Sequence, residues 1–314
     1  MRFAAFVLAL SASAQEFPSA EIRNAAITAK FYLPDPERGY YRGTRFDWSG
    51  VIYSLRTANH EYFGKWFPKY DPKLHDAIMG PVEEYRTNNA GLGYDEAKPG
   101  GTFIRIGVGV VRKPEEAQYQ GFKTYDIVDH GKWRVRPKKD RITFTHELAD
   151  GGGYAYRYTK VIRLVKDSPV MRIEHTLKNT GSKPIQTSQY NHNFFVIDGQ
   201  PVGPDTFVSV PFELRANRPF GQEPGKAQGR EIGYTREVRD GDRVFAEFAG
   251  GEYDIRAGNR RTGAAVHITA DLPISKLVYW SIRTVFSPEP YVDLNIPPGG
   301  AKTWTYTYHF YEVK

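Results

Sequence analysis

The chain has 314 residues, of which 40% are hydrophobic and 25% charged, and it contains no cysteine. This is the composition of an ordinary globular protein, and the lack of cysteine excludes disulfide bonds and thiolate metal sites. The net charge of +7 is distributed without a run of five like charges, which excludes a clustered nucleic-acid-binding surface. Either a mildly basic surface or a preference for anionic substrates accounts for the charge.

The N-terminus has the features of a secretory signal. Arg2 provides a positive start, residues 3–10 are apolar, and residues 11–14 have small side chains. We therefore predict a signal peptide over residues 1–14, cleavage after Ala14 and an exported protein. The alternative is a disordered or packed N-terminus. The apolar run is too short to span a bilayer, and no other segment approaches that length.

Helix is expected to be scarce. Residues 71–79 predict one short helix, with Pro72 in its first turn. Residues 63–101 around it and the later residues 218–233 are polar and rich in turn formers, and they predict long loops. Long loops in a β protein often form the walls or lids of a site.

Most of the chain after residue 100 predicts β-strands. Apolar and polar residues alternate with a period of two in several segments, and turn-forming residues separate these segments. The expected strands are residues 141–148, 154–164, 170–177, 253–257, 264–269, 277–282 and 302–311. In the last of these, Trp304, Tyr306, Tyr308 and Phe310 share one face.

Many strands with so little helix predict an all-β protein made of two large, packed antiparallel sheets. No internal repeat, low-complexity tract or linker-like change in composition divides the chain. Residues 15–314 are therefore predicted to form one domain.

Four segments contain residue types that can carry chemistry. They are residues 42–48 with Arg45, residues 129–133 with His130 and Trp133, residues 191–193 with Asn191, His192 and Asn193, and residues 287–291 with Glu289. A lone histidine in a β protein usually has a structural role, and a glutamate between two prolines is usually a solvated turn residue. A buried imidazole, however, must be hydrogen-bonded or used in chemistry.

The order of these segments resembles the galactose mutarotase-like family, which includes the aldose 1-epimerases and hexose-phosphate epimerases. The resemblance runs from about residue 100 to the C-terminus, and more loosely includes residues 43–45. The matching features, in chain order, are His130-Gly131 with Trp133, the turn Asn179-Thr180-Gly181, His192 before Phe194 and Phe195, Glu289, the turn Pro298-Gly299, and the aromatic strand from Trp304 to Phe310. The resemblance implies a β-supersandwich with a sugar site on the concave face of one sheet.

The resemblance also implies an aldose 1-epimerase chemistry. Glu289 would be the general base that takes the proton of the anomeric hydroxyl, and His192 would be the general acid that protonates the ring oxygen. The ring would open, the aldehyde would rotate, and reclosure would give the other anomer. The residues assigned to substrate binding are His130, Trp133, Arg45, Asn191 and Asn193.

The proposed reaction needs one acid and one base, and neither a metal nor a hydride donor. The sequence contains no glycine-rich phosphate loop and no metal-ligand spacing. We therefore predict a saccharide ligand, no cofactor and no metal site.

The chain departs from the family's pattern in three places. The family's His-Gly-Phe-Ala-Arg segment is His130-Gly-Lys-Trp-Arg here, and residues 63–98 have no counterpart. The substrate-binding aspartate of the family has only two weak candidates, Asp242 and Asp254.

Two other function classes stay open on the sequence. An exported carbohydrate-binding protein without turnover would also be rich in aromatic residues. A polysaccharide lyase or glycosidase is the third hypothesis, but Asp293 and Glu289 would lie roughly 13 Å apart along one strand, wide for a carboxylate pair. The sugar, its phosphorylation and the oligomeric state are not determined by the sequence.

Overall fold

The computed structural model describes residues 17–149 and 152–313. The predicted signal peptide, residues 1–14, lies outside the described residues. The regular secondary structure of the described chain is almost entirely β-strand, and its helical structure is limited to the single turn η1 (Ile197–Gly199). This confirms the all-β prediction. No helix in this part of the chain has the length and hydropathy needed to cross a lipid bilayer.

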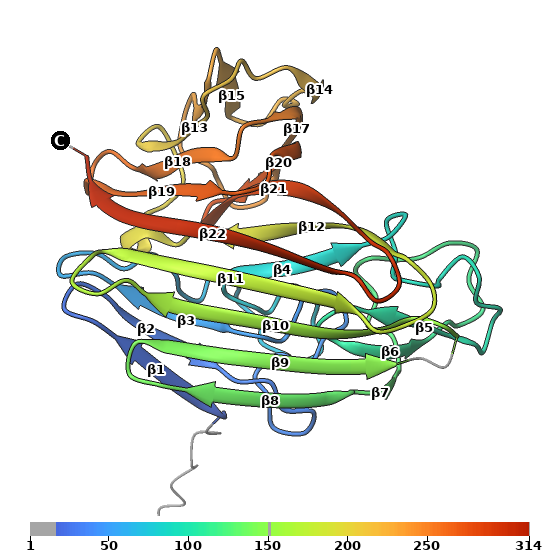
Figure 1. Cartoon of the computed structure of the whole chain (residues 1–314). Helices are drawn as coiled ribbons and strands as arrows, with labels where there is room; N and C mark the ends of the chain where they lie inside the picture. The colour runs from blue at the N-terminus through green and yellow to red at the C-terminus, as the bar shows by residue number, and fades with distance from the viewer. Residues whose placement is uncertain (1–16, 150–151, 314) are drawn as a thin grey trace, which may run out of the picture.

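The largest sheet has ten strands in the order β15-β16-β13-β18-β19-β22-β11-β10-β9-β8, all antiparallel (Figure 1). Its strands are β8 (Lys132–Pro137), β9 (Arg141–Ala149), β10 (Ala155–Leu164), β11 (Val170–Asn179), β13 (Thr206–Ser209), β15 (Gly225–Gln228), β16 (Glu231–Tyr234), β18 (Asp254–Asn259), β19 (Ala264–Ala270) and β22 (Ala301–Glu312).

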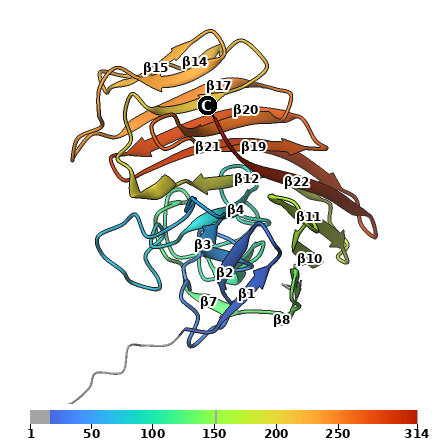
Figure 2. The same ribbon diagram turned by 90° about the vertical axis from the view of Figure 1, so that its left-hand side faces the viewer.

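A six-stranded antiparallel sheet in the order β14-β17-β20-β21-β12-β4 lies beside it, as the end view in Figure 2 shows. Its strands are β4 (Gly80–Arg86), β12 (Ile185–Phe194), β14 (Ala216–Arg218), β17 (Val244–Gly251), β20 (Ile274–Ile282) and β21 (Val285–Ile296). Two three-stranded sheets complete the described structure. They consist of β1 (Ser19–Arg23), β2 (Thr28–Tyr32) and β3 (Val51–Arg56), and of β5 (Thr102–Arg105), β6 (Gly109–Arg112) and β7 (Ile127–Asp129).

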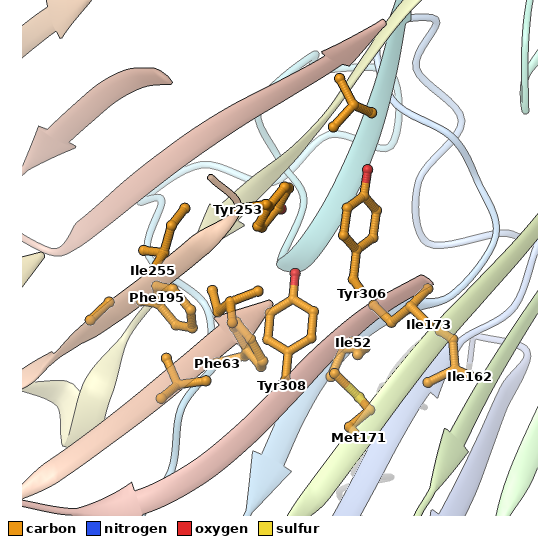
Figure 3. Close-up of a cluster of buried hydrophobic side chains, with 14 of the residues drawn as sticks. Ile52, Phe63, Ile162, Met171, Ile173, Phe195, Tyr253, Ile255, Tyr306 and Tyr308 are labelled. Atoms are coloured by element: carbon orange, nitrogen blue, oxygen red, sulfur yellow. The ribbon is translucent and has the colours of Figure 1, made fainter. Parts of the chain in front are cut away.

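Alternating burial explains why the long strands form where the sequence predicts them. Along β10, β11 and β22, every second residue is buried, because successive side chains of a strand point to opposite faces. Trp304, Tyr306, Tyr308 and Phe310 are all buried on the inner face of β22 and belong to the main core. Figure 3 shows Tyr306 and Tyr308 within this core. All seven predicted strands are confirmed within three residues at each end.

Polar contacts tie the inner face of β22 to the inner face of β12. The hydroxyl of Tyr308 donates to Asn193 Oδ1 at 2.8 Å and accepts from Asn191 Nδ2 at 2.8 Å. The hydroxyl of Tyr306 donates to Gln189 Oε1. Because side chains alternate along a strand, these contacts turn the odd-numbered residues of β12 into the sandwich. His192 therefore lies on the opposite, outer face.

The predictions of one short helix and of two long loops are wrong. Residues 71–79 form two successive turns, closed by Leu74 N to Asp71 O and Ala77 N to Leu74 O hydrogen bonds, and not a helix. The expected loop over residues 63–101 contains β4, and the loop over 218–233 contains β15 and β16. β4 gives no alternation signal because almost all its residues are buried, its charged ones included.

Candidate active site

The centre of the site is a contact between an imidazole and a carboxyl group on neighbouring strands. β12 pairs with β21 in antiparallel register, with Tyr190 opposite Tyr291. Two residues further along β12 and two residues earlier on β21, His192 and Glu289 meet on the outer face. His192 Nε2 lies 3.1 Å from Glu289 Oε1, and the two residues are 3% and 5% exposed.

The other side of the His192 ring is also fixed. The Ser287 hydroxyl lies 2.7 Å from His192 Nδ1. The Phe194 ring stacks on the imidazole with a centroid distance of 3.7 Å and an interplanar angle of 15°. Both imidazole nitrogens therefore have a polar partner, and the ring plane is held by an aromatic neighbour, so the orientation of the acid–base group is set before any ligand arrives.

Burial changes the proton affinity of both groups. It raises the pKa of Glu289 to about 8, although Arg45 and Arg86 oppose the rise. Burial, followed by the charge of Arg45, lowers the pKa of His192 well below its ordinary value. Both directions follow because a buried site disfavours the charged form of either group. Near neutral pH the two side chains therefore share one proton.

The pair opens into a cavity of about 380 Å³ on the outer face of the six-stranded sheet. Its walls combine aromatic and charged side chains from β4, β12, β17, β20 and β21 and from the segments that carry Arg45, Asp76, Phe122 and Arg243. The lining residues are Arg45, Asp76, Arg86, Phe122, His192, Phe194, Arg243, Phe245, Glu247, Lys276, Val278, Trp280, Glu289 and Tyr291. The volume is at the lower end of the range for small-molecule sites, which suits a ligand of one sugar ring.

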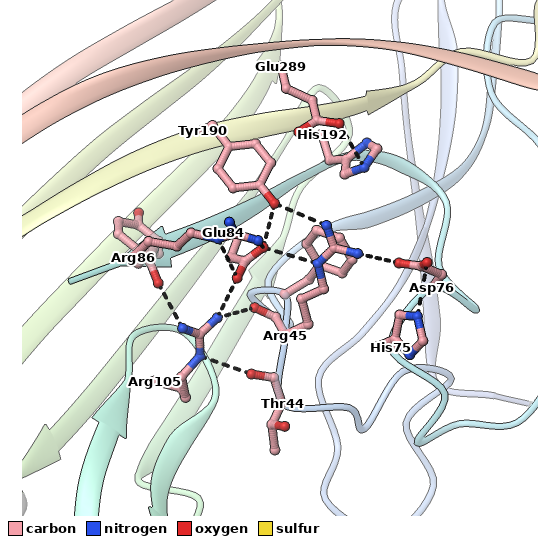
Figure 4. A network of polar contacts seen from close by, with 12 residues as sticks. Thr44, Arg45, His75, Asp76, Glu84, Arg86, Arg105, Tyr190, His192 and Glu289 are labelled. Carbon is pink, nitrogen blue, oxygen red and sulfur yellow. Dashed lines mark hydrogen bonds and ion pairs between the residues drawn. The ribbon is translucent and has the colours of Figure 1, made fainter. Parts of the chain in front are cut away.

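Arg45 is held in this cavity by a buried carboxylate. Arg45 Nε lies 3.1 Å from Glu84 Oε2, and a second bond joins its Nη1 to Asp76 Oδ1 (Figure 4). The hydroxyl of Tyr190 donates to Glu84, and Arg86 Nη2 donates to Glu84 Oε2 at 3.0 Å. These charges keep the pKa of Glu84 far below its usual value even though burial acts the other way.

Arg105 fixes the backbone that carries Arg45. Arg105 is 1% exposed, and it donates to Thr44 O at 3.0 Å, to Arg45 O at 2.7 Å and to Glu84 Oε1 at 3.0 Å. The Arg45 side chain is thus positioned at both its backbone and its guanidinium, as charge-assisted hydrogen bonds favour.

Two loops form the rim of the cavity. The ring of Phe122, which is 65% exposed, lies 5.0 Å from the Arg45 guanidinium and packs against His75 with ring centroids 4.8 Å apart and tilted by 48°. His75 in turn contacts the Asp76 carboxylate at 3.1 Å. An exposed phenylalanine over a polar cavity is a surface available to a ligand.

The structure brings together some of the residues predicted for the site and not others. Glu289, His192 and Arg45 line one cavity. Asn191 and Asn193 do not line it, because they lie on the inner face of β12 and bind Tyr308.

Trp133 lies on β8, an edge strand of the ten-stranded sheet, and His130 lies directly before β8. Neither residue lines this cavity. His130 packs against Trp48 with ring centroids 5.4 Å apart, and Trp133 stacks on His146 at 4.1 Å. Asp254 binds His267 at 2.9 Å, and Asp242 binds Arg236 at 2.7 Å. Neither of these two aspartates lines the cavity of His192.

Several residues of the site had no signal in the sequence analysis. Glu84 and Arg86 lie on β4, within the segment predicted to be a loop. Asp76 lies in the segment predicted to be a helix. Trp280 and Tyr291 belong to predicted or motif-bearing strands, but nothing marked them as site residues. The sequence does offer one signal for this part of the site, the adjacent acids Glu83 and Glu84 before Arg86. Acids at the edge of a hydrophobic segment require partners if they are buried.

Among the described residues, no group of three or more histidine or acidic side chains is placed to hold a metal ion. The nitrogen atoms of His192 are both occupied by Ser287 and Glu289. The arrangement offers acid–base chemistry on a bound polar molecule.

Comparison with known proteins identifies the fold. No family model matches the sequence, and no curated protein matches it. The structure is similar to that of the Slr1438 protein from Synechocystis sp. PCC 6803, with a TM-score of 0.61 and 12% identity over 98% of this chain and 100% of that one.

Two further solved structures carry descriptive names. A galactose mutarotase related enzyme from Lactobacillus acidophilus has a TM-score of 0.56 and 12% identity, covering 94% of this chain and 99% of its own. A GalM/aldose epimerase homologue from C. elegans has a TM-score of 0.56 and 14% identity, with the same coverage. Likeness at this level of identity establishes architecture and not activity. The chain therefore has the galactose mutarotase-like fold, as its sequence had implied.

Proposed function

We propose that the protein is an aldose 1-epimerase-like isomerase that opens and recloses the pyranose ring of a sugar held against His192 and Glu289. The observation that carries the proposal is the 3.1 Å contact between an acid and a base at the floor of a sugar-sized cavity. The fold shared with mutarotase-like structures adds a reason to choose this chemistry.

The two groups match the atoms of a hemiacetal. The anomeric hydroxyl and the ring oxygen are bonded to the same carbon, so one base and one acid in contact with each other can reach both. In the reacting form the shared proton has passed from Glu289 to His192 across their 3.1 Å contact. Glu289 as carboxylate then takes the proton of the anomeric hydroxyl, and His192 as imidazolium gives a proton to the ring oxygen. The anomeric C–O bond gains double-bond character and the ring C–O bond breaks.

Reclosure runs the same steps in reverse after rotation about the bond to the aldehyde carbon. The new hydroxyl takes its proton back from Glu289, and the re-formed ring oxygen returns its proton to His192. The enzyme therefore ends each cycle with the one shared proton with which it began. Acid and base catalysis of this kind typically contributes 10²–10⁴-fold per group.

The rest of the cavity has positioning roles. Trp280 and Tyr291 supply apolar surface for the faces of a sugar ring. Arg45 and Arg86 supply hydrogen-bond donors toward sugar oxygens, because Glu84 holds both of them in place.

The test is anomer exchange in a panel of aldoses, followed by NMR or polarimetry. Wild type should accelerate the exchange for at least one sugar, and Glu289→Gln should lower that acceleration by at least about 10²-fold. Glu247→Gln is the matched control, since Glu247 lines the same cavity but does not contact His192. No acceleration by wild type for any aldose would rule the proposal out.

A second candidate is a carbohydrate-binding protein without turnover. It is favoured by the aromatic walls of the cavity and by the absence of His130 and Trp133 from it. Calorimetric binding of a sugar whose anomers are not exchanged would select this candidate. For the glycosidase hypothesis, Asp293 is exposed and does not line the cavity, so its proposed partnership with Glu289 is not supported.

A further inference from the structure

A second cavity adjoins the candidate active site. Its volume is about 500 Å³. It is lined by residues 65–68 before β4, residues 239–243 before β17, and residues 282–284 at the turn between β20 and β21. Nothing in the proposed reaction uses this cavity.

The two cavities share a wall. Arg243 lines both of them. Trp280 of the first cavity and Trp66 of the second pack edge to face with ring centroids 5.6 Å apart. Trp66 also stacks at 5.0 Å on Phe194, the residue that stacks on His192. A ligand with its terminal unit at His192 can therefore extend over Arg243 into the second cavity.

The second cavity is rich in positive charge. Four of its lining residues are cationic, namely Lys65, Arg239, Arg243 and Arg283, against the two acids Asp240 and Asp242. Asp242 is already engaged by Arg236 at 2.7 Å, and Arg283 lies 3.4 Å from Glu237. Within residues 17–149 and 152–313, Lys65, Arg239 and Arg243 have no carboxylate within ion-pair distance.

Arg243 differs from the other arginines of the first cavity. Arg45 and Arg86 are both bound to the buried Glu84, and Lys276 lies 3.5 Å from Glu247. Arg243 is exposed and has no such partner in the described chain. A guanidinium presents two parallel N–H donors that match a carboxylate, so the boundary between the cavities is suited to an anionic group.

We propose that the two cavities together bind an acidic oligosaccharide, with its reducing-end unit against His192 and Glu289 and the carboxylate of the adjoining uronate unit on Arg243. The placement of the reducing end rests on the proposed function. The second cavity then holds the next part of the chain, between the Trp66 and Phe67 walls and the side chains of Lys65 and Arg239. The net charge of the chain allows a preference for anionic substrates, and the proposal assigns that preference to Arg243 and the second cavity.

The proposal is tested by binding, which does not depend on turnover. Calorimetry compares matched disaccharides with galacturonyl, glucuronyl or mannuronyl non-reducing units, each paired with the neutral sugar that lacks only the carboxylate charge. At low ionic strength, wild type should bind the acidic member of at least one pair about tenfold more tightly. The preference should shrink as salt is added.

Variants locate the preference. Arg243→Gln should bring the acidic and neutral members of that pair to within about twofold of each other. Arg239→Gln should reduce the preference less, because Arg239 lies only in the second cavity. Arg134→Gln is the matched control, since Arg134 is an exposed arginine on β8 that lines neither cavity, and it should retain the full preference.

Each contrary outcome is informative. Equal affinities for both members of every pair, or a preference that survives Arg243→Gln, would overturn the proposal. Binding of monosaccharides without any disaccharide would overturn it too, and would leave the proposed isomerase intact. Failure of every saccharide to bind would overturn both.

Discussion

Two of the sites with buried ionisable side chains in the described chain are built in opposite ways. The interior charge cluster, which we define as Asp47, Glu83, Lys160 and His175, lies between the two large sheets. Lys160 Nζ lies 3.0 Å from Glu83, and His175 Nε2 lies 2.9 Å from the same carboxylate. The cavity pair, His192 and Glu289, lies on the outer face, and its one carboxyl group meets one imidazole.

The two sites differ in how burial is offset. In the interior charge cluster, burial alone would raise the pKa of Glu83, but Lys160 and His175 lower it to about 2. In the cavity pair, burial wins, and the pKa of Glu289 rises to about 8. A carboxylate surrounded by cations stays ionised and holds the sheets together, whereas a carboxyl group without a close cation keeps a proton that it can exchange.

The strand β4 contributes one buried, ionised acid to each of these two regions. Glu83 and Glu84 are adjacent, and they point to opposite faces of the six-stranded sheet. Glu83 binds Lys160 inside the sandwich, and Glu84 binds Arg45 behind the cavity. The comparison of the interior charge cluster with the cavity pair predicts that substitutions of Glu83 and Glu289 will have opposite effects on the free energy of unfolding.

The largest effect is expected from Glu83→Gln. The substitution leaves His175 without its anion and Lys160 with only the more distant Asp47 carboxylate at 3.7 Å, in a dry interior, so the free energy of unfolding should fall by about 3–5 kcal/mol. Urea denaturation at pH 7 measures the change. Glu174→Gln is the control, because Glu174 pairs with Arg163 at 3.0 Å on an exposed face, and its cost should stay below about 1 kcal/mol. A cost for Glu83→Gln as small as that of the control would refute a structural role for the interior charge cluster.

The ordinary pKa of a glutamate side chain is 4.5, and the pKa of Glu289 in the folded protein is about 8. Between these values the folded state holds a proton that the unfolded state releases, so stability falls as pH rises through this window. Glu289→Gln removes that penalty, and it should raise the free energy of unfolding at pH 7 by about 1–3 kcal/mol. The gain should vanish near pH 4. Thermal denaturation at both pH values measures it, and a destabilised variant at pH 7 would contradict the assigned proton.

The sequence predicts the long strands well and the site only in part. β9, β10, β11 and β22 each bury one face, so their alternation is visible in the sequence. β4 buries charged side chains on both faces, and no local pattern reveals it. The partners that make such burial possible, Lys160 and Arg105, are contributed by strands far along the chain.

The same reasoning explains the outcome for individual site residues. His192 and Glu289 were paired through the resemblance, and strand register brings them together. Asn191 and Asn193 were assigned to the same site because they flank His192 in the sequence. A strand turns adjacent residues to opposite faces, so their side chains enter the sandwich and bind Tyr308.

The pH dependence of anomer exchange tests the shared proton. The reacting form, with Glu289 as carboxylate and His192 as imidazolium, carries one proton. The form in which both side chains are neutral also carries one proton. Activity should therefore form a plateau that extends below the ordinary histidine pKa, since the pKa of His192 is lowered. Above about pH 8, the proton of the pair is lost, and the rate should fall up to about tenfold per pH unit. A rate that rises through pH 8 would show that Glu289 works without a protonated partner.

The smallest effect is expected from Ser287→Ala, which removes the hydroxyl at His192 Nδ1. Losing one buried hydrogen bond should cost about 1 kcal/mol of stability, and a less firmly held imidazole should slow anomer exchange by up to about tenfold. Ser281→Ala is the matched control, because Ser281 is equally buried on the adjacent strand β20 but binds Tyr234. It should lose similar stability and keep full activity. If both variants lose activity equally, the effect comes from strand packing; if only Ser287→Ala does, the hydroxyl orients the acid, and the outer face of β21 supplies both the base and the group that positions its partner.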